Sequence, residues 1–297
     1  MSRRLASRTT RLGPWALAAP TVLSVLVFAV YPLVYLVLLA LSESNLGQPF
    51  RAWVGMQNIT DALGDALVRD SLVHGAVFAV ATTVLSVLLG VAIALLLDSS
   101  VRDGRVLRTL LLLPLMTPPI TVAVAWRLLF EPSGPLNGVL EGIGIASEPV
   151  AFLATSPWAM GALIVADVWQ WTPLVVLLVF AALRGVPEDV YEAARVDGAS
   201  GREILTAITL PMVLPAIVAV GLLKLILSFK LFDLVYMLTA GGPGFDTTTS
   251  AYDIYRTALE SFDIGSAAAK TLIFVVFVSL VVMPVVKLRD WTERRLT

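Results

Sequence analysis

The sequence alternates between long apolar runs and shorter polar stretches. A helix needs about 20 predominantly apolar residues to cross a hydrocarbon core of about 30 Å. Six runs meet this requirement. We therefore predict six transmembrane helices, at about 15–41, 72–97, 106–130, 158–183, 208–237 and 267–287. The polar stretches between them, at about 42–71, 98–105, 131–157, 184–207 and 238–266, are predicted to be loops.

The composition supports an all-α polytopic membrane protein with one transmembrane domain over residues 1–297. Hydrophobic residues make up 58% of the chain, charged residues 14%, and the mean hydropathy is +0.86. Soluble domains have about 25% charged residues. The first apolar run is longer than a signal-peptide core of about 7–15 residues. We therefore interpret it as a retained span.

The distribution of lysine and arginine predicts the orientation of the chain. With a cytoplasmic N-terminus, fourteen basic residues fall on the inner side and only four on the outer side. Cytoplasmic loops are enriched in basic residues, so both termini and residues 184–207 are predicted to face the cytoplasm. The inner set is Arg3, Arg4, Arg8, Arg11, Arg102, Arg105, Arg108, Arg184, Arg195, Arg202, Lys287, Arg289, Arg294 and Arg295, and the outer set is Arg51, Arg69, Arg127 and Arg256.

The polar stretch between the fourth and fifth spans has the pattern of a helix, a turn and a second helix. Pro187 fits a first helical position, where its missing N–H costs nothing. Gly198 can adopt the left-handed conformation that ends a helix. Ser200 and Glu203 match the S-x-x-E capping box that starts the next helix. We predict a short cytoplasmic helix held between two spans.

Three prolines interrupt the third predicted span. Pro114, Pro118 and Pro119 remove backbone donors and are expected to kink or break the helix. Such a break is tolerated in a membrane where neighbouring helices or an aqueous cavity satisfy the freed groups. The sequence leaves two interpretations open, a packing kink and a segment that lines a transport pathway.

The chain carries no recognisable enzymatic motif. It has no cysteine and one histidine, His74, which excludes thiolate chemistry and a multi-histidine metal site. A lone histidine near the start of the second span is more often an interfacial residue than a proton relay. No G-x-x-x-x-G-K-[ST] phosphate loop occurs, and the glycine-rich residues 241–250 lack the lysine. We predict that this chain binds no cofactor.

The fourth span carries a polar and aromatic cluster. Asp167, Trp169, Gln170 and Trp171 lie near the middle of the span. An acid and an amide can bond the hydroxyl groups of a polyhydroxylated ligand, and tryptophan can cover its apolar ring face. The alternative is structural, with tryptophans that pack and Asp167 bonded to a neighbouring helix. These residues are candidates for the substrate pathway.

The fifth span is interrupted by Lys224, Lys230 and Asp233. Charged residues inside spans are costly and mark functional sites by default. The spacing of three residues would allow Lys230 and Asp233 to pair on one helical face. Lys224 lies deeper and needs a partner or water. All three are further candidates for the pathway.

The loop between the fourth and fifth spans and the start of the fifth span carry a longer pattern. The pattern E-A-A-x3-G-x9-I-x-L-P is matched at Glu192, Ala193, Ala194, Gly198, Ile208, Leu210 and Pro211. It resembles the signature of the permease subunits of bacterial binding-protein-dependent ABC importers. The chain is most similar to their carbohydrate (maltose and glycerol-phosphate) branch, because residues 232–243 are similar to that branch's F-D-x4-L-T-x-G-G-P stretch and residues 53–58 to its first outer loop. A large extra domain found after the second span in some relatives is absent.

The resemblance implies how such a chain works. In the family, the Glu-Ala-Ala helix docks into a cleft of a cytoplasmic ATPase subunit. Glu192 would be the charged contact, Ala193 and Ala194 would allow close approach, and Gly198 would set the turn. The implied partners are a second homologous permease, two ATPase subunits that bind ATP and Mg, and an extracytoplasmic substrate-binding protein, with membrane lipid around them and no nucleic acid.

The expected function is therefore import of a sugar or related polyhydroxylated solute across the bacterial cytoplasmic membrane by alternating access. Two other classes compete. For an ion-driven secondary transporter, six spans are few and buried carboxylates are sparse, although an oligomer could compensate. A receptor subunit would not need a helix-turn-helix coupling loop.

Overall fold

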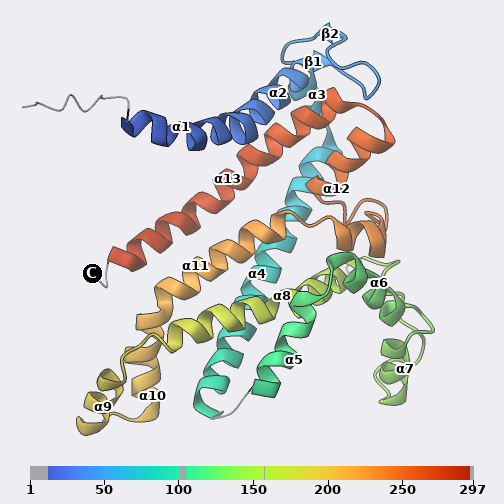
Figure 1. Cartoon of the computed structure of the whole chain (residues 1–297). Helices are drawn as coiled ribbons and strands as arrows, with labels where there is room; N and C mark the ends of the chain where they lie inside the picture. Colours follow the sequence, from blue (N-terminus) through green and yellow to red (C-terminus); the bar gives the residue numbers. More distant parts are fainter. Residues whose placement is uncertain (1–12, 101–104, 157, 295–297) are drawn as a thin grey trace, which may run out of the picture. The chain divides into compact units, whose positions relative to one another are not determined.

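The computed structural model describes residues 13–100, 105–156 and 158–294. Arg3, Arg4, Arg8, Arg11, Arg102 and Arg295, which entered the charge count, lie outside the described residues. Helices dominate the described part of the chain, as the predicted all-α class requires (Figure 1). A short antiparallel pair of strands joins β1 (Ser42–Glu43) to β2 (Ala52–Trp53).

Several helices contain π-helical turns, labelled η, and some of these turns join neighbouring helices into one longer helix. The elements in chain order are α1 (Gly13–Val25), η1 (Leu26–Val30), α2 (Tyr31–Ala40), α3 (Gln57–Gly64), α4 (Ala66–Ser100), α5 (Arg105–Met116), α6 (Pro119–Phe130), α7 (Pro135–Gly142), α8 (Trp158–Leu183), α9 (Glu188–Val196), α10 (Gly201–Glu203), η2 (Ile204–Thr209), α11 (Leu210–Phe229), η3 (Val235–Thr239), α12 (Ser250–Tyr255), η4 (Arg256–Glu260) and α13 (Ile264–Arg294).

Five helices of the described chain are long and apolar enough to cross a membrane. They are Ala18–Ala40, Ala66–Asp98, Trp158–Leu183, Gly201–Phe229 and Ile264–Thr292. Five of the six predicted segments therefore correspond to one continuous helix each. A sixth span over 106–130 is not confirmed, because this segment is divided into α5, which ends at Met116, and α6, which begins at Pro119; the break itself was expected from the prolines. The prolines account for this break, since Pro118 and Pro119 have no N–H to continue the helical bonding.

The predicted boundaries of the fifth span were wrong at both ends. The helix begins at Gly201, within the predicted loop, and runs through η2 into α11. It ends at Phe229 rather than near residue 237, and the chain resumes helical structure only before η3. The hydroxyl of Thr249 donates to the carbonyl of Leu231 at 3.0 Å in the non-helical stretch that follows. A contact from 18 residues away thus helps to hold the chain out of the helix.

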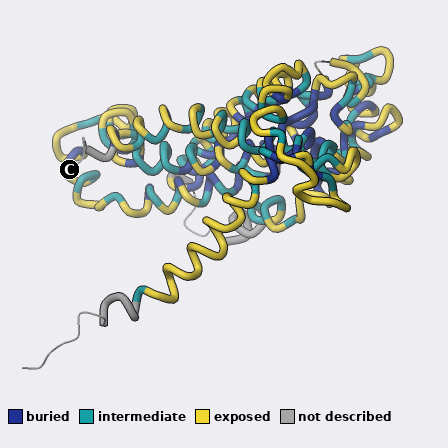
Figure 2. Tube along the Cα trace, turned by 90° about the horizontal axis from the view of Figure 1, so that it is seen from above, coloured by how far each residue is buried: buried dark blue, intermediate teal, exposed yellow. Residues whose placement is uncertain are grey.

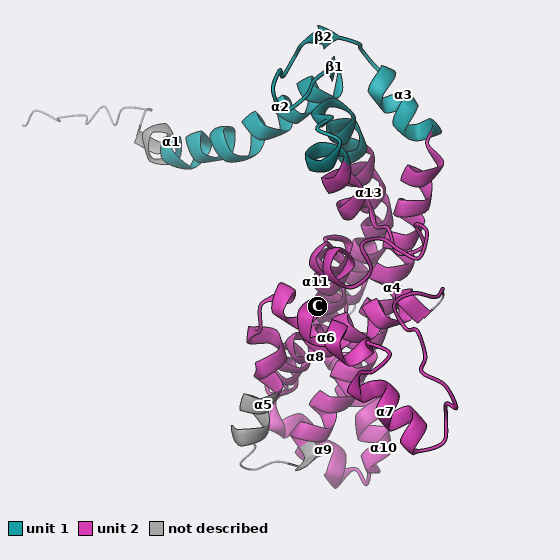
Figure 3. Cartoon of the chain, turned by 90° about the vertical axis from the view of Figure 1, so that its right-hand side faces the viewer, with its two compact units in different colours: residues 1–64, 257–272 teal, residues 65–256, 273–297 magenta. Residues whose placement is uncertain are grey.

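The described chain divides into two compact units (Figure 3). The first comprises residues 1–64 and 257–272. In it, Leu39 and Ala40 at the end of α2 pack against Ala268 and Ala269 of α13. The side chain of Asn58 donates to the carbonyl of Ala40 at 3.0 Å and to that of Ser42 at 2.9 Å. This asparagine belongs to the outer-loop motif at residues 53–58, so it has a structural role in the turn after α2.

The second unit, residues 65–256 and 273–297, is built around α4, α8 and α11. Buried residues concentrate inside the helical bundle, while long stretches of helix surface are exposed (Figure 2). On α4 the buried face carries Thr82, Ser86, Gly90 and Ala94 at intervals of four residues. A Cβ atom at Gly90 would come within 2.5 Å of Val175 Cγ1 on α8. Small residues therefore allow α4 and α8 to approach closely, as in other membrane helix pairs.

Candidate functional site

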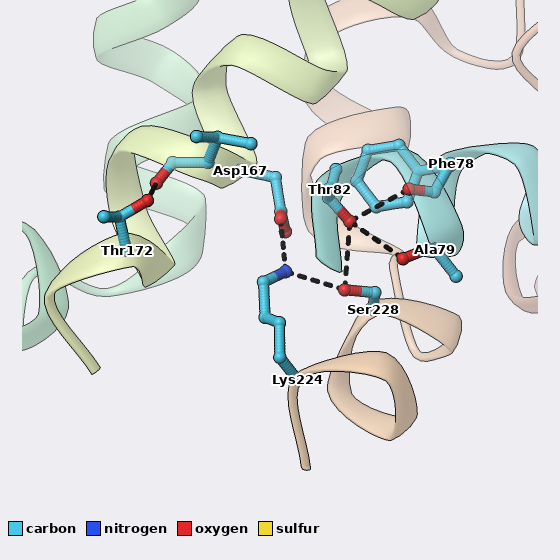
Figure 4. Close-up of polar contacts among 8 residues, drawn as sticks. Phe78, Ala79, Thr82, Asp167, Thr172, Lys224 and Ser228 are labelled. Atoms are coloured by element: carbon cyan, nitrogen blue, oxygen red, sulfur yellow. Dashed lines mark hydrogen bonds and ion pairs between the residues drawn. The ribbon is translucent and has the colours of Figure 1, made fainter. Parts of the chain in front are cut away.

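A buried ion pair lies inside the second unit. Lys224 Nζ on α11 donates to Asp167 Oδ1 on α8 at 2.5 Å and to Ser228 Oγ at 2.6 Å (Figure 4). The side chains of Lys224 and Asp167 are only 1% and 5% exposed. Each charge is thus removed from solvent and satisfied by the other. This is the structural role that the sequence left open for Asp167, and it supplies the partner that Lys224 needs.

The polar network continues to a third helix. The Thr82 hydroxyl on α4 lies 3.1 Å from the Ser228 hydroxyl and 2.9 Å from the carbonyl of Phe78 (Figure 4). Thr82 and Ser228 are both buried. The network therefore ties α4, α8 and α11 together at one level of the bundle. Neither Thr82 nor Ser228 was among the sequence candidates, because hydroxyl residues are common in spans and neither lies in a recognisable motif.

A cavity of about 160 Å³ adjoins this network. Five of the sequence candidates line it, namely Asp167, Gln170, Trp171, Lys230 and Asp233, together with Pro119, Leu227, Leu231, Phe232 and Leu234. Acidic, basic, amide and indole groups therefore converge on one hollow. Two lysines and two aspartates lie in or directly beside it, so its formal charge is balanced.

Trp169 lies elsewhere. Successive helical residues are about 100° apart, so residues 167, 170 and 171 share a face of α8 and residue 169 does not. Trp169 is exposed and packs edge-on against Trp126 of α6, with ring centroids 5.9 Å apart. It lines a separate, largely apolar pocket with Pro114. Trp169 and Trp171, predicted as one aromatic cluster, therefore line two different pockets.

Lys230 and Asp233 form no ion pair with each other in the described structure, in contrast to the pairing that their spacing allows. The reason is the end of α11 at Phe229. Lys230 is the capping residue and the next two residues are not helical, so a spacing of three residues no longer places two side chains on one helical face.

The break between α5 and α6 contributes to the same site. Pro119 lines the cavity, and the Gln170 amide donates to the carbonyl of Thr117 at 3.1 Å. A buried amide from α8 thus satisfies a carbonyl that the prolines release. The break thus has the helix-to-helix hydrogen bond that a packing kink requires, and it also borders the cavity.

A cluster of aromatic rings extends from the cavity toward α12. Phe232 stacks on Tyr236 with ring centroids 5.5 Å apart and lies 4.9 Å from the ring of Tyr255. Tyr252 stacks on Tyr255 at 6.3 Å. The sequence analysis did not identify these tyrosines, because they lie up to 23 residues from Phe232 and carry no local pattern.

The glycine-rich segment after η3 folds into a closed turn rather than an open phosphate cradle. The Thr247 hydroxyl lies 2.8 Å from that of Thr239 and donates to the carbonyl of Gly242 at 2.7 Å. Gly241 has φ +83°, and a Cβ there would lie 2.5 Å from Thr248 Oγ1. The threonines that follow the glycines therefore bond back onto the glycine backbone.

The predicted helix-turn-helix is present at one end of the second unit, as α9 and α10 (Figure 1). Gly198 has φ +80°, as a left-handed helix stop requires. The capping box is formed, because Ser200 N donates to Glu203 Oε2 at 2.7 Å and Glu203 N donates to Ser200 Oγ at 3.4 Å. One detail differs from the prediction, since Pro187 is the N-cap and α9 begins one residue later, at Glu188.

The two motif alanines have different environments. Ala193 is exposed beside the exposed Glu192, whereas Ala194 is buried. Val196 on the same helix is 88% exposed, the highest value among the large hydrophobic side chains of the described chain. The other motif residues lie on the helix that follows, with Ile208 and Leu210 half-buried and Pro211 exposed.

No group of three or more histidine, cysteine, aspartate or glutamate side chains that could hold a metal occurs among the described residues. His74 lies within α4, and its Nδ1 atom is buried without a hydrogen-bond partner in the described structure. The site therefore consists of a charged, hydrogen-bonded cavity within a helical bundle and an exposed helix at one end of that bundle.

The fold and the site define an all-α polytopic membrane protein with the transmembrane fold of ABC importers. Residues 86–297 match the family model described as binding-protein-dependent transport system inner membrane component. The chain belongs to this family. It is a permease subunit, and the ATPase of such a transporter is a separate subunit.

Named relatives are similar over most of their length. The trehalose/maltose transport system permease protein MalF of Thermococcus litoralis is 33% identical over 287 residues, covering 95% of each chain. The trehalose transport system permease protein SugA of Mycobacterium tuberculosis (strain ATCC 25618 / H37Rv) is 31% identical over 277 residues, covering 92% of this chain and 87% of SugA.

A solved structure shares the fold. It is that of a bacterial alginate ABC transporter in complex with an alginate pentasaccharide-bound periplasmic protein. It aligns with a TM-score of 0.78 and 22% identity, over 96% of this chain and 94% of the matched chain.

Proposed function

We propose that this permease carries a sugar or related polyhydroxylated solute into the cytoplasm and that α9 receives the movement of the ATPase. The observation that carries the proposal is the exposed surface of α9, where Glu192, Ala193 and Val196 lie beside a turn set by Gly198. Glu192 and Val196 are four residues apart and so lie on one face of the helix, and Ala193 beside them is small.

We further propose six spans, with both termini and α9 in the cytoplasm. The basic residues favour this orientation. Together, α5 and α6 run from Arg105 to Phe130, which is long enough to cross the membrane as a broken helix. On this proposal residues 1–297 act as one permease domain.

The substrate pathway is proposed to pass the cavity lined by Asp167, Gln170, Trp171, Lys230 and Asp233. These groups offer donors, acceptors and an aromatic face, as a sugar requires. Lys224 stabilises the Asp167 carboxylate at the cavity wall. The charge balance of the cavity favours an uncharged substrate, in agreement with the disaccharides in the names of MalF and SugA.

We propose that all the fixed residues of the E-A-A-x3-G-x9-I-x-L-P pattern take part in coupling the ATPase to the helices of the permease. Glu192 would form the charged contact to the ATPase, Ala193 and Ala194 would allow close approach and packing, and Gly198 would direct the helix. Ile208, Leu210 and Pro211 lie where the second helix of the loop enters the span, and would carry the movement into the bundle.

The proposed partners are a second homologous permease, two ATPase subunits that bind ATP and Mg, and an extracytoplasmic binding protein. The periplasmic protein in the alginate transporter supports the last of these. The loops at 42–71, 131–157 and 238–266 would contact it. The proposed location is the bacterial cytoplasmic membrane.

The test is substrate uptake by the complete transporter in proteoliposomes. Glu192→Lys or Gly198→Leu is expected to abolish ATP-dependent uptake and to weaken co-purification of the ATPase, while membrane insertion is retained. The charge reversal removes the docking carboxylate, and the leucine strains the left-handed turn at φ +80°.

Asp290→Lys is the matched control, because it reverses an exposed carboxylate at the proposed cytoplasmic side on α13, a different helix from α9. Full uptake in both test variants would rule out the coupling role of α9.

A further inference from the structure

A second, larger cavity lies beside α9. Its volume is about 780 Å³, within the roughly 300–1,000 Å³ typical of ligand pockets. It is bounded by the last turns of α4, by α9 and by the beginning of the helix that leads into α11. Leu95, Leu96, Ile204 and Leu205 form an apolar wall, and Tyr191 and Arg195 lie at the α9 side.

The charge of this cavity is not balanced. Asp98, which also lines it, is paired with Arg184 at 3.1 Å. Arg184 in turn lies over the Phe180 ring, 5.1 Å from its centroid. Arg195 is exposed and has no ion-pair partner among the described residues. One guanidinium group therefore remains available for an anionic ligand.

The position of the cavity restricts the kind of ligand. The α4 span ends at Asp98, and the neighbouring span begins at Gly201. Asp98 and Gly201 line the cavity, so on the proposed orientation it lies at the cytoplasmic ends of two apolar helices. A ligand there has an apolar part along the leucines and an anionic part at Arg195. A soluble anion would leave the apolar wall uncovered.

We propose that this cavity binds an anionic phospholipid of the cytoplasmic leaflet. The phosphate accepts hydrogen bonds from Arg195 and from the Tyr191 hydroxyl, and an acyl chain lies along Leu95, Leu96, Ile204 and Leu205. The inference rests on the orientation and the coupling role proposed above. The lipid would then fill the space between α4 and α9, and support the coupling helix from the side of the bundle.

The experiment uses the complete transporter in nanodiscs of phosphatidylcholine with increasing phosphatidylglycerol. Native mass spectrometry counts retained phosphatidylglycerol, and ATPase activity is measured across the series. Arg195→Gln is expected to raise the phosphatidylglycerol fraction needed for half-maximal activity about fivefold and to remove a retained lipid, as loss of one basic contact at a membrane surface predicts.

Arg202→Gln is the matched control, since Arg202 is an exposed arginine on α10 that does not line the cavity. Leu205→Trp tests the site without altering charge, because the indole would occupy the acyl-chain wall, and it is expected to remove the same lipid. Equal effects of Arg195→Gln and Arg202→Gln would overturn the proposal, as would unchanged lipid retention in Leu205→Trp.

The absence of cysteine in the chain permits a further check. Leu205→Cys carrying a photo-crosslinker is expected to capture phosphatidylglycerol. Capture of an ATPase or permease subunit instead would show that protein fills the cavity, and would contradict the proposal. The mass-spectrometric count does not depend on sugar uptake, so failure of the proposed substrate class would be seen separately.

Discussion

At the scale of single residues, Asp167 and Lys224 determine how charge is held inside the bundle. Removing two ions from water is costly, and their attraction compensates only when additional hydrogen bonds satisfy the remaining donors. Ser228 accepts one of these bonds at 2.6 Å. The pair is therefore tolerated as a unit, and either member alone would leave a buried, uncompensated charge.

We expect Lys224→Met to lower the free energy of unfolding by about 3–5 kcal/mol, because Asp167 loses its partner. The double variant Asp167→Asn/Lys224→Met is expected to recover much of this loss. A detergent unfolding titration of the purified permease in mixed micelles, followed by tryptophan fluorescence, measures the cycle. Lys230→Met, at an exposed lysine that forms no ion pair with any residue the structure describes, is the control and should change stability by less than about 0.5 kcal/mol. If the losses of unfolding free energy in Asp167→Asn and in Lys224→Met simply add up in the double variant, the two charges are not coupled.

The sequence identified both residues of this pair but not the pair itself. A charge inside an apolar run is visible locally, whereas the partner of Lys224 lies 57 residues away. Local spacing favoured Lys230 with Asp233 instead. The same limit explains why Thr82, Ser228 and the tyrosines beside Phe232 were missed, since their contacts come from helices that only the fold brings together.

At the scale of elements, helix starts and stops were predictable wherever one residue type determines them. Pro118 and Pro119 predicted the break before α6, and Ser200 predicted the start of α10. The end of α11 at Phe229 was not predictable, because apolar residues continue beyond it and the hydrogen bond from Thr249 is a tertiary contact.

Close packing of α4 on α8 depends on Gly90. Gly90→Ala is expected to lower the free energy of unfolding by about 1–3 kcal/mol, because the new Cβ would meet Val175 Cγ1 at 2.5 Å and force the helices apart. Gly75→Ala is the control, on the same helix but with no atom within 4 Å of the added Cβ. There the better helix propensity of alanine should be neutral or stabilising by up to about 1 kcal/mol. The same unfolding titration compares them, and equal stability of the two variants would contradict the packing argument.

At the scale of the whole molecule, the number of membrane crossings depends on α5 and α6. Each has 12 residues, too few to cross alone. The apolar composition of residues 106–130 predicts a span, because a mean hydropathy over the segment does not detect a break in the helix. Whether the two short helices cross together determines the side of the membrane on which residues 131–157 lie.

The cysteine-free chain allows this to be tested with single cysteines and an impermeant maleimide. Leu46→Cys and Ile145→Cys, both at exposed loop positions, should label from the outer side of sealed membranes if α5 and α6 cross as one broken span. Val196→Cys should label only after the membranes are opened. With five crossings, positions 46 and 145 would label from opposite sides. The unmodified chain controls for background.

The π-helical turn η2, Ile204–Thr209, lies between the capped start of α10 and the long helix α11. Such turns and the nearby Pro215 are the places where helices bend. If α9 receives the movement of the ATPase as proposed, this segment is where the helix can bend. Part of that movement would then be absorbed as bending near η2 before it reaches the part of α11 beside the cavity.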